Sequence, residues 1–148
     1  MKNRVASTLA LVGLFTVLAA SSAQGQVPAK MIVSVPFDFT AGKATLKAGK
    51  YSIKHSNGAA LSIRSLDGTS TVLVSAPLTL SSQSVKGGER LVFNRYGDRY
   101  FLSQVWLSVD TGRQVYPSEQ EKKTAHQFEL ANRNAKPERV EISIRGNE

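Results

Sequence analysis

Apolar and polar residues alternate strictly from residue 33 to residue 39. Val33, Val35, Phe37 and Phe39 are apolar, and Ser34, Pro36 and Asp38 lie between them. A period of two is typical of a strand with one buried face. Because Pro36 has no N–H to donate to a sheet ladder, the strand is predicted to lie at a sheet edge or to carry a bulge at this residue.

The Asp67-Gly68 dipeptide predicts a β-hairpin with a two-residue turn of type I′. In that register Ile63 faces Val72, and the other apolar residues of this face also meet apolar partners. A shift of one residue would bring polar side chains onto the same face. We therefore expect the segments on either side of this turn to pair as adjacent strands.

A second hairpin turn is predicted at residues 56–58. A two-residue loop at Asn57-Gly58 would place Ile53 opposite Ser62 and mix apolar with polar residues. A three-residue loop over 56–58, with Gly58 in the left-handed conformation, instead pairs Ile53 with Leu61. We expect the three-residue loop.

A long hairpin is predicted over residues 90–107, with its turn at Gly97-Asp98. Glycine at the first central position suits a type II′ turn, which places Arg95 opposite Tyr100 and Tyr96 opposite Arg99. Both faces are apolar: one is expected to carry Leu91, Phe93, Tyr100, Leu102 and Trp106, and the other Val92, Tyr96, Phe101, Val105 and Leu107. Such a hairpin needs a covering layer on each face or a partner.

One helix is predicted over residues 118–133. Ser118 is followed three residues later by Glu121, a spacing typical of a capping box, and Lys136-Pro137 ends the helical pattern. A loop followed by a strand is the alternative for this segment. Alternation at Val140, Ile142 and Ile144 predicts a final strand. The chain is therefore predicted to be mainly β, as a single antiparallel β-barrel or β-sandwich meander of seven to nine short strands with one helix in its C-terminal half.

The first 25 residues have the pattern of a secretory signal peptide. Lys2 and Arg4 precede an uncharged run over residues 5–20, and small residues follow, so cleavage after Ala23 or after Gly25 fits equally well. The alternative is a membrane anchor, but the run of roughly 16 residues is shorter than the ~20 that a spanning helix needs. We expect a single domain over residues 26–148, exported to the periplasm or the cell exterior and not membrane-spanning once processed.

Cysteine is absent from the 148 residues. Its absence excludes disulfides, thiolate zinc sites, iron–sulfur clusters and thiol nucleophiles. The two histidines, His55 and His126, leave little for a metal site or for base catalysis. No metal, cofactor or catalytic residue is predicted.

Basic residues outnumber acidic residues, 19 to 11, for a formal charge of +8. The predicted leader holds Lys2 and Arg4, so the mature chain has 17 basic and 11 acidic residues and a charge of +6. Lys50 and Lys54 have the parity opposite to their apolar neighbours and are predicted to face outward. Dispersed positive charge is compatible with an anionic partner, such as acidic polysaccharide or lipid phosphate, and export argues against nucleic acid. The alternative is a solvated face whose charge keeps a secreted protein soluble.

The basic and aromatic residues of the long hairpin are the candidate ligand-binding site. Arginine and tyrosine at a turn can hold an anionic or sugar ligand by hydrogen bonding and ring stacking. The alternative is structural, because cross-strand pairs of this kind stabilise a hairpin by about 0.2–1 kcal/mol each without a ligand. The candidate residues are Arg95, Tyr96, Arg99, Tyr100 and Trp106.

These observations favour an exported, non-catalytic binding or structural module of the cell envelope, with an anionic or carbohydrate surface or an envelope protein as partner. A small secreted hydrolase is one alternative and would need His55 or His126 hydrogen-bonded to a serine and an acid, although no Gly-x-Ser-x-Gly motif is present. The other alternative is an assembly subunit that uses an exposed edge strand, such as residues 33–39, for strand addition.

Three motifs together resemble a group of small exported bacterial proteins of unknown function that is abundant in Acidobacteria. The motifs are Val35-Pro36-Phe37-Asp38-Phe39, Leu46-Lys47-Ala48-Gly49-Lys50-Tyr51 and Arg95-Tyr96-Gly97-Asp98-Arg99-Tyr100-Phe101-Leu102. The resemblance implies an exported, mainly β domain and no particular activity or site residue. The chain departs from the expected pattern at Lys47, where a proline would precede Ala48-Gly49.

Overall fold

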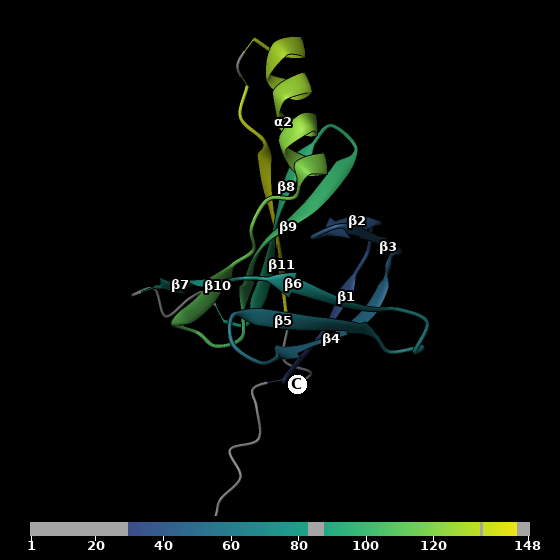
Figure 1. Cartoon of the computed structure of the whole chain (residues 1–148), viewed down its shortest axis with the longest axis vertical. Coiled ribbons are helices and arrows are strands. Elements are labelled where there is room, and N and C mark those ends of the chain that lie inside the picture. The colour runs from purple at the N-terminus through teal and green to yellow at the C-terminus, as the bar shows by residue number, and fades with distance from the viewer. Residues whose placement is uncertain (1–29, 83–87, 134, 145–148) are drawn as a thin grey trace, which may run out of the picture.

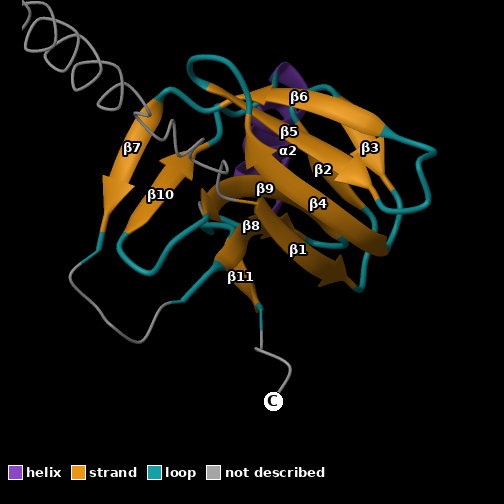
Figure 2. Ribbon diagram, turned by 90° about the horizontal axis from the view of Figure 1, so that it is seen from below, coloured by secondary structure: helices purple, strands orange, loops and turns teal. Residues whose placement is uncertain are grey.

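The computed structural model describes residues 30–82, 88–133 and 135–144. The predicted signal peptide lies outside the described residues. The described chain forms eleven strands in two sheets and one helix, α2 (Glu119–Ala131) (Figures 1 and 2). The four-stranded sheet has the order β1 (Lys30–Val35), β4 (Gly49–His55), β5 (Ala60–Ser65), β6 (Thr71–Ser75). The seven-stranded sheet has the order β11 (Glu138–Ser143), β8 (Arg90–Tyr96), β9 (Arg99–Trp106), β10 (Thr111–Gln114), β7 (Leu78–Ser81), with β2 (Phe39–Ala41) paired to both β9 and β3 (Ala44–Leu46).

This arrangement confirms a mainly β fold with one helix in the C-terminal half and decides between the two predicted architectures. The sheets form a β-sandwich-like pair and do not close into a barrel. The prediction of seven to nine strands was too low, because β2, β3, β7 and β10 have only three or four residues each. A strand that short leaves almost no alternation in the sequence from which to detect it.

The predicted strand over residues 33–39 is divided between the two sheets. β1 ends at Val35, the chain crosses over at Pro36, and β2 begins at Phe39 in the other sheet. The alternation persists across the break because both Val35 and Phe39 are buried in the same core between the sheets. As expected from Pro36, β1 is an edge strand.

The β5–β6 hairpin has the predicted register but a different turn. Ile63 pairs with Val72, as expected. Gly68 has a φ of 77°, whereas Asp67 does not have positive φ, and type I′ requires it at both residues. The Gly68 N–H donates to the Ser65 carbonyl (3.1 Å), and the Ser65 N–H donates to the Ser70 carbonyl (2.9 Å). The turn therefore consists of the four residues 66–69 and not of two.

The predicted register of the β4–β5 hairpin was wrong by two residues. Ile53 pairs with Ile63, and the Ser56 N–H donates to the Ala60 carbonyl, so the three loop residues are 57–59. Gly58 is left-handed, as predicted, with a φ of 65°. A shift of two residues keeps every side chain on its face, and the apolar pattern therefore cannot detect it.

The β8–β9 hairpin has the predicted tip and an unpredicted bulge. Arg95 pairs with Tyr100, and Gly97 has a φ of 65°, as a type II′ turn requires. The ladder then shifts between Val92 and Phe93, so Ser103 is the extra residue on β9. Because of this bulge, the residues of β9 beyond it lie on the faces opposite to those predicted. Val105 and Leu107 belong to the core with Leu91, Phe93 and Leu102, whereas Trp106 lies on the opposite face with Val92, Tyr96 and Phe101.

The hydrophobic core fills the space between the two sheets. Phe39 connects the layers, since its ring makes edge contacts with Tyr51 of the four-stranded sheet (5.3 Å between centroids) and with Phe93 of the seven-stranded sheet (5.4 Å). The buried members are Met31, Val33, Val35, Phe39, Ala41, Leu46, Tyr51, Ile53, Leu61, Ile63, Val74, Ala76, Leu91, Phe93, Leu102, Val105, Leu107 and Val115. The core therefore uses only the inner face of the four-stranded sheet.

The helix covers the outer face of the hairpin tip. Ser118 is the N-cap and its hydroxyl accepts from the Glu121 N–H (3.2 Å), as predicted. The Glu121 carboxylate does not return to the N-cap as in a capping box; it is buried and accepts from the Asn94 amide of β8 (2.9 Å). Phe128 makes an edge contact with Tyr96 (5.7 Å between centroids), and α2 lies beside the projecting β8–β9 tip (Figure 1).

Gly112 allows β10 to pack against Trp106, and we expect Gly112→Ala to destabilise the fold by about 1–3 kcal/mol through overpacking. A Cβ at this position would lie 2.5 Å from Trp106 Cδ2. Gly49→Ala is the matched control, because its Cβ would meet neighbours only at 3.8 Å or more. Urea unfolding of both variants measures the difference. Equal stability of the two variants would show that the indole moves aside freely.

Candidate functional site

The structure does not bring the five candidate residues of the hairpin into one cluster. Arg95 and Tyr100 lie on the core-facing side of the tip, whereas Tyr96 and Arg99 lie on the side that α2 covers. Trp106 is at the far end of β9, seven residues or roughly 23 Å from Arg99. A single ligand-binding site formed by all five is therefore not present in this arrangement.

Arg95 and Tyr100 have structural partners within the chain. The Arg95 guanidinium donates to the Gly97 carbonyl (2.7 Å) and to the Glu138 carboxylate of β11 (3.1 Å). The Tyr100 ring stacks on Phe37 with 3.8 Å between centroids. These contacts fix the hairpin tip to β11 and to the chain segment that joins β1 and β2.

Tyr96 and Arg99 attach the tip to the helix. The Tyr96 hydroxyl is hydrogen-bonded to Glu121, and burial raises the pKa of this tyrosine to about 12. Arg99 donates to the Thr124 hydroxyl (2.8 Å). Burial also raises the pKa of Glu121 above its usual value, although the hydrogen bonds from Asn94 and Tyr96 oppose this effect. These contacts tie the tip to α2.

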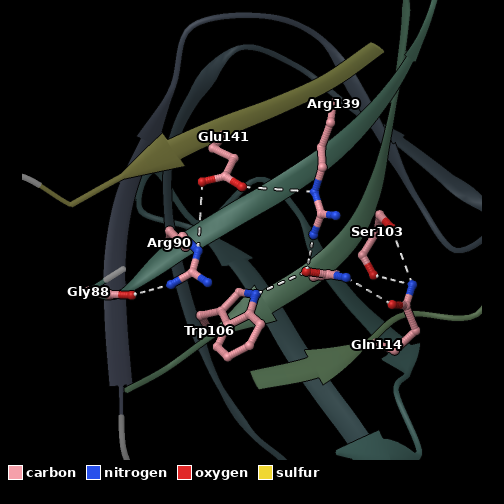
Figure 3. A network of polar contacts seen from close by, with 8 residues as sticks. Gly88, Arg90, Ser103, Trp106, Gln114, Arg139 and Glu141 are labelled. Atoms are coloured by element: carbon pink, nitrogen blue, oxygen red, sulfur yellow. Dashed lines mark hydrogen bonds and ion pairs between the residues drawn. The ribbon is translucent and has the colours of Figure 1, made fainter. Parts of the chain in front are cut away.

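Trp106 lies beneath a network of polar side chains on the outer face of the seven-stranded sheet (Figure 3). The Arg90 guanidinium is 4.2 Å from the indole centroid, and the indole N–H donates to Gln104 Oε1 (3.1 Å). Gln104 also accepts from Arg139 (2.6 Å). Because Trp106 is only 5% exposed, its ring has no free face on which a sugar could stack.

The three motifs behind the family resemblance meet in space. Asp38 of the first motif accepts from Lys47 Nζ (2.8 Å) and from the Ala48 N–H (2.9 Å) of the second. The hydrogen bond from Lys47 is the main reason why the pKa of Asp38 is lowered. Phe37, also of the first motif, stacks on Tyr100 of the third. These motif residues hold the turns together, and Lys47 makes with Asp38 a contact that proline could not make.

A second candidate site lies on the outer face of the four-stranded sheet. We call it the basic face and define it by the side chains that point away from the core on β1, β4, β5 and β6. They are Lys30, Ile32, Ser34, Lys50, Ser52, Lys54, Ser62, Arg64, Thr71, Leu73 and Ser75. Four of these residues are cations and none is acidic. The prediction that Lys50 and Lys54 face outward is confirmed.

Two lysines of the basic face lie directly opposite each other. Lys30 of β1 pairs with Lys54 of β4. The Leu66 N–H donates to the Lys50 carbonyl, so the main chain of Lys54, four residues along, also points toward β5. The Lys30–Lys54 pair is therefore a non-hydrogen-bonded pair, in which side chains are closest and like charges are destabilising. The pair therefore concentrates two positive charges at one point of the basic face.

The cations of the basic face remain available to a ligand. Among the described residues, none of Lys30, Lys50, Lys54 and Arg64 forms an ion pair. Lys30, Lys54 and Arg64 line a shallow hollow of about 520 Å³ together with Ser52, Ser62, Ser65, Leu66 and Thr71. The hollow thus combines unpaired positive charge with hydroxyl groups that can donate or accept hydrogen bonds.

Two of the four cations of the basic face, Lys50 and Lys54, were predicted from the sequence to face outward. The parity rule that identified Lys50 and Lys54 applies equally to Arg64, which follows the buried Ile63, and would have found it. Lys30 has the parity opposite to Val33 and Val35, so the same rule places it on the outward face of its strand. Its position beside Lys54 could not be predicted, because it depends on the pairing of β1 with β4, and β2 and β3 lie between these strands in the sequence.

The histidines do not form the arrangement that a hydrolase would need. Neither His55 nor His126 is hydrogen-bonded to a serine and an acid within the part of the chain that the structure describes. Burial, and then the charge of Arg113, lower the pKa of His55. Nor do the described residues contain a group of histidine and acidic side chains able to hold a metal ion.

Comparison with protein-family models, with curated proteins and with solved structures gives no match. Across residues 30–82, 88–133 and 135–144, no helix has the length and apolar character needed to cross a membrane.

Glu121→Gln tests the cost of the buried carboxylate between α2 and β8. The raised pKa means that the native state binds this proton more tightly than the unfolded state. The native state is therefore favoured below the usual pKa of glutamate, and this contribution is lost as pH rises toward the native value. We expect Glu121→Gln to have a higher Tm than the parent at pH 7, with the difference disappearing below about pH 4. Thermal unfolding against pH measures this; a lower Tm at pH 7 would contradict it.

Proposed function

We propose that this protein is an exported, non-catalytic module that binds acidic polysaccharide of the cell envelope through the basic face. The observation that carries the proposal is the group of four cations on one sheet face, two of them directly opposed and none paired with an acid in the described structure. The predicted signal peptide and the family resemblance support export, which stays a prediction.

Several properties of the basic face favour an acidic polysaccharide over other anionic partners. Serine and threonine side chains lie between the cations, where they can bond to sugar hydroxyl groups. The face has no aromatic ring, so recognition would rest on charge and hydrogen bonding and not on stacking. Its exposed aliphatic residues, Ile32 and Leu73, lie on opposite edge strands and do not form one apolar patch for insertion into lipid.

The spacing of the cations suits an extended polymer. Lys50 and Lys54 are four residues apart on β4, or about 13 Å. Lys30 of β1 lies opposite Lys54. Arg64 of β5 lies opposite Ser52, midway between the two lysines of β4, with about 5 Å between neighbouring strands. A chain with repeated carboxylates can contact several of these cations at once, whereas a small anion contacts one or two.

We expect Lys54→Gln combined with Arg64→Gln to weaken binding of a galacturonate oligomer about tenfold at low salt, because each exposed ionic contact contributes up to ~1 kcal/mol to the binding free energy. The dependence of the affinity on salt should also become shallower, because fewer counterions are displaced. Titration calorimetry of the purified protein at several salt concentrations measures both quantities.

The matched control is Lys122→Gln combined with Lys123→Gln, which removes the same charge from exposed positions on α2 and should leave binding nearly unchanged. Neutral dextran should not bind. An equal loss in both double variants would show that net charge alone attracts the polymer. Stronger binding to phosphatidylglycerol vesicles than to the oligomer would contradict a polysaccharide partner.

A further inference from the structure

We propose that the free edge of β6 accepts an extended peptide as an added strand, in which apolar residues alternate with acidic residues. The proposal concerns main-chain recognition and goes beyond binding at the basic face. It replaces residues 33–39 with β6 as the edge for strand addition.

The hydrogen bonds at the two ends of the β5–β6 ladder determine which groups point outward. The Ser65 N–H donates to the Ser70 carbonyl, and the Ala76 N–H donates to the Ala59 carbonyl. Residues of even number on β6 therefore face β5, and Thr71, Leu73 and Ser75 direct their N–H and carbonyl groups away from it. Only the Ser75 carbonyl has a main-chain partner at this edge of the described structure, the Tyr116 N–H (3.2 Å).

A groove of about 620 Å³ runs beside this edge. Its walls are β6, the β2–β3 turn and the segment that leads into α2. Gly42 in that turn has a φ of 60°, and a Cβ there would lie 3.3 Å from Val74 Cγ1, so the turn lies close against β6. The groove is lined by apolar residues, among them Ala44, Val74, Val115 and Tyr116, and also by the charged residues Lys43 and Glu119.

The groove begins where main-chain pairing to the outer edge of β6 ends. Tyr116 donates one hydrogen bond to the edge, and Pro117 then directs the chain away toward the helix N-cap. An added strand would continue from this point along Leu73 and Thr71 and satisfy their outward N–H and carbonyl groups. Tyr116, which is 51% exposed, offers apolar surface to the residues of such a peptide that enter the groove.

The composition of β6 differs from that of a protected edge. Natural edge strands are commonly blocked by charge, proline or a bulge. β1 carries Lys30, and β11 carries Glu138, Arg139 and Glu141, whereas the Thr-Val-Leu-Val-Ser sequence of β6 has neither charge nor proline. β7 is also uncharged, and it provides a control.

The two sides of the edge define the sequence of the partner. Alternate side chains of an added strand point to opposite faces of the sheet. Those on the inner side would enter the groove beside Val74 and Ala44, which favours apolar residues. Those on the outer side would extend the basic face next to Thr71. Because Thr71 pairs with Arg64 of β5, this side favours acidic residues in the partner.

The test uses a capped octapeptide of alternating valine and glutamate, titrated into isotope-labelled protein and followed by amide NMR. We expect the largest shifts at Thr71 and Leu73, and binding at least tenfold weaker for alternating valine and lysine. A peptide of four valines followed by four glutamates has the same composition and should not bind. No shift on β6 at ~2 mM peptide, at the millimolar limit of useful affinity, would overturn the proposal.

Leu73→Pro removes only an outward N–H and leaves the β5 ladder intact, so we expect the fold to persist and peptide binding to be lost. Ser34→Pro on the edge of β1 and Leu78→Arg on β7 are matched controls that should bind normally. If Leu73→Pro disturbs the remaining spectrum, Ala44→Trp, which fills the groove, takes its place. Peptide binding that survives in the variant used, or that is lost equally in the controls, would overturn the proposal.

These variants also separate this inference from the proposed function, because they keep all four cations of the basic face and should bind galacturonate oligomer as the parent does. A parent protein that dimerises through β6, shown by sedimentation and abolished by Leu73→Pro, would instead identify a second copy as the occupant and contradict a peptide partner.

Discussion

The β8–β9 hairpin is apolar on both faces, and the rest of the structure depends on covering it twice. Its inner face carries Leu91, Phe93 and Leu102, which form the core with the four-stranded sheet. Its outer face is covered by α2 at the tip and by the polar network around Trp106 at the base. Because the hairpin occupies only one face of the four-stranded sheet, the other face is left to solvent. The basic face is therefore exposed because the β8–β9 hairpin covers only the inner face of the four-stranded sheet.

The sequence predicted the parts of this arrangement that depend on neighbouring residues. The turn at Gly97 and the N-cap at Ser118 could be recognised because their chemistry is local. The bulge at Ser103 could not, since it lies inside an unbroken apolar alternation and moves Trp106 to the other face. The two-residue shift between β4 and β5 was equally hidden, because it leaves every side chain on its predicted face.

The candidate binding site moved from the hairpin tip to the basic face because contacts between distant segments of the chain could not be predicted from the sequence. A dense run of arginine and aromatic residues at the hairpin tip suggested ligand binding, but contacts with Glu138, Phe37 and Thr124 account for the residues there. The cations of the basic face come from β1, β4 and β5 and meet only when these strands pair. Positive charges that lie together on one face without an acidic partner, more than a local density of arginine and aromatic residues in the sequence, therefore distinguish the surface that is available for binding. The adjoining edge of β6 shows a similar feature in its main chain, where the outward N–H and carbonyl groups of Thr71 and Leu73 have no main-chain partner in the described structure.

The most direct test of binding at the basic face is an amide NMR footprint of a galacturonate oligomer on the isotope-labelled protein at low salt. We expect the largest shifts on the basic face, at Lys30, Ser52, Lys54, Ser62 and Arg64, and we expect them to diminish as salt is added. Shifts concentrated at the hairpin tip, residues 95–100, with the basic face unchanged, would contradict this expectation and return the binding site to the arginines and tyrosines of β8 and β9.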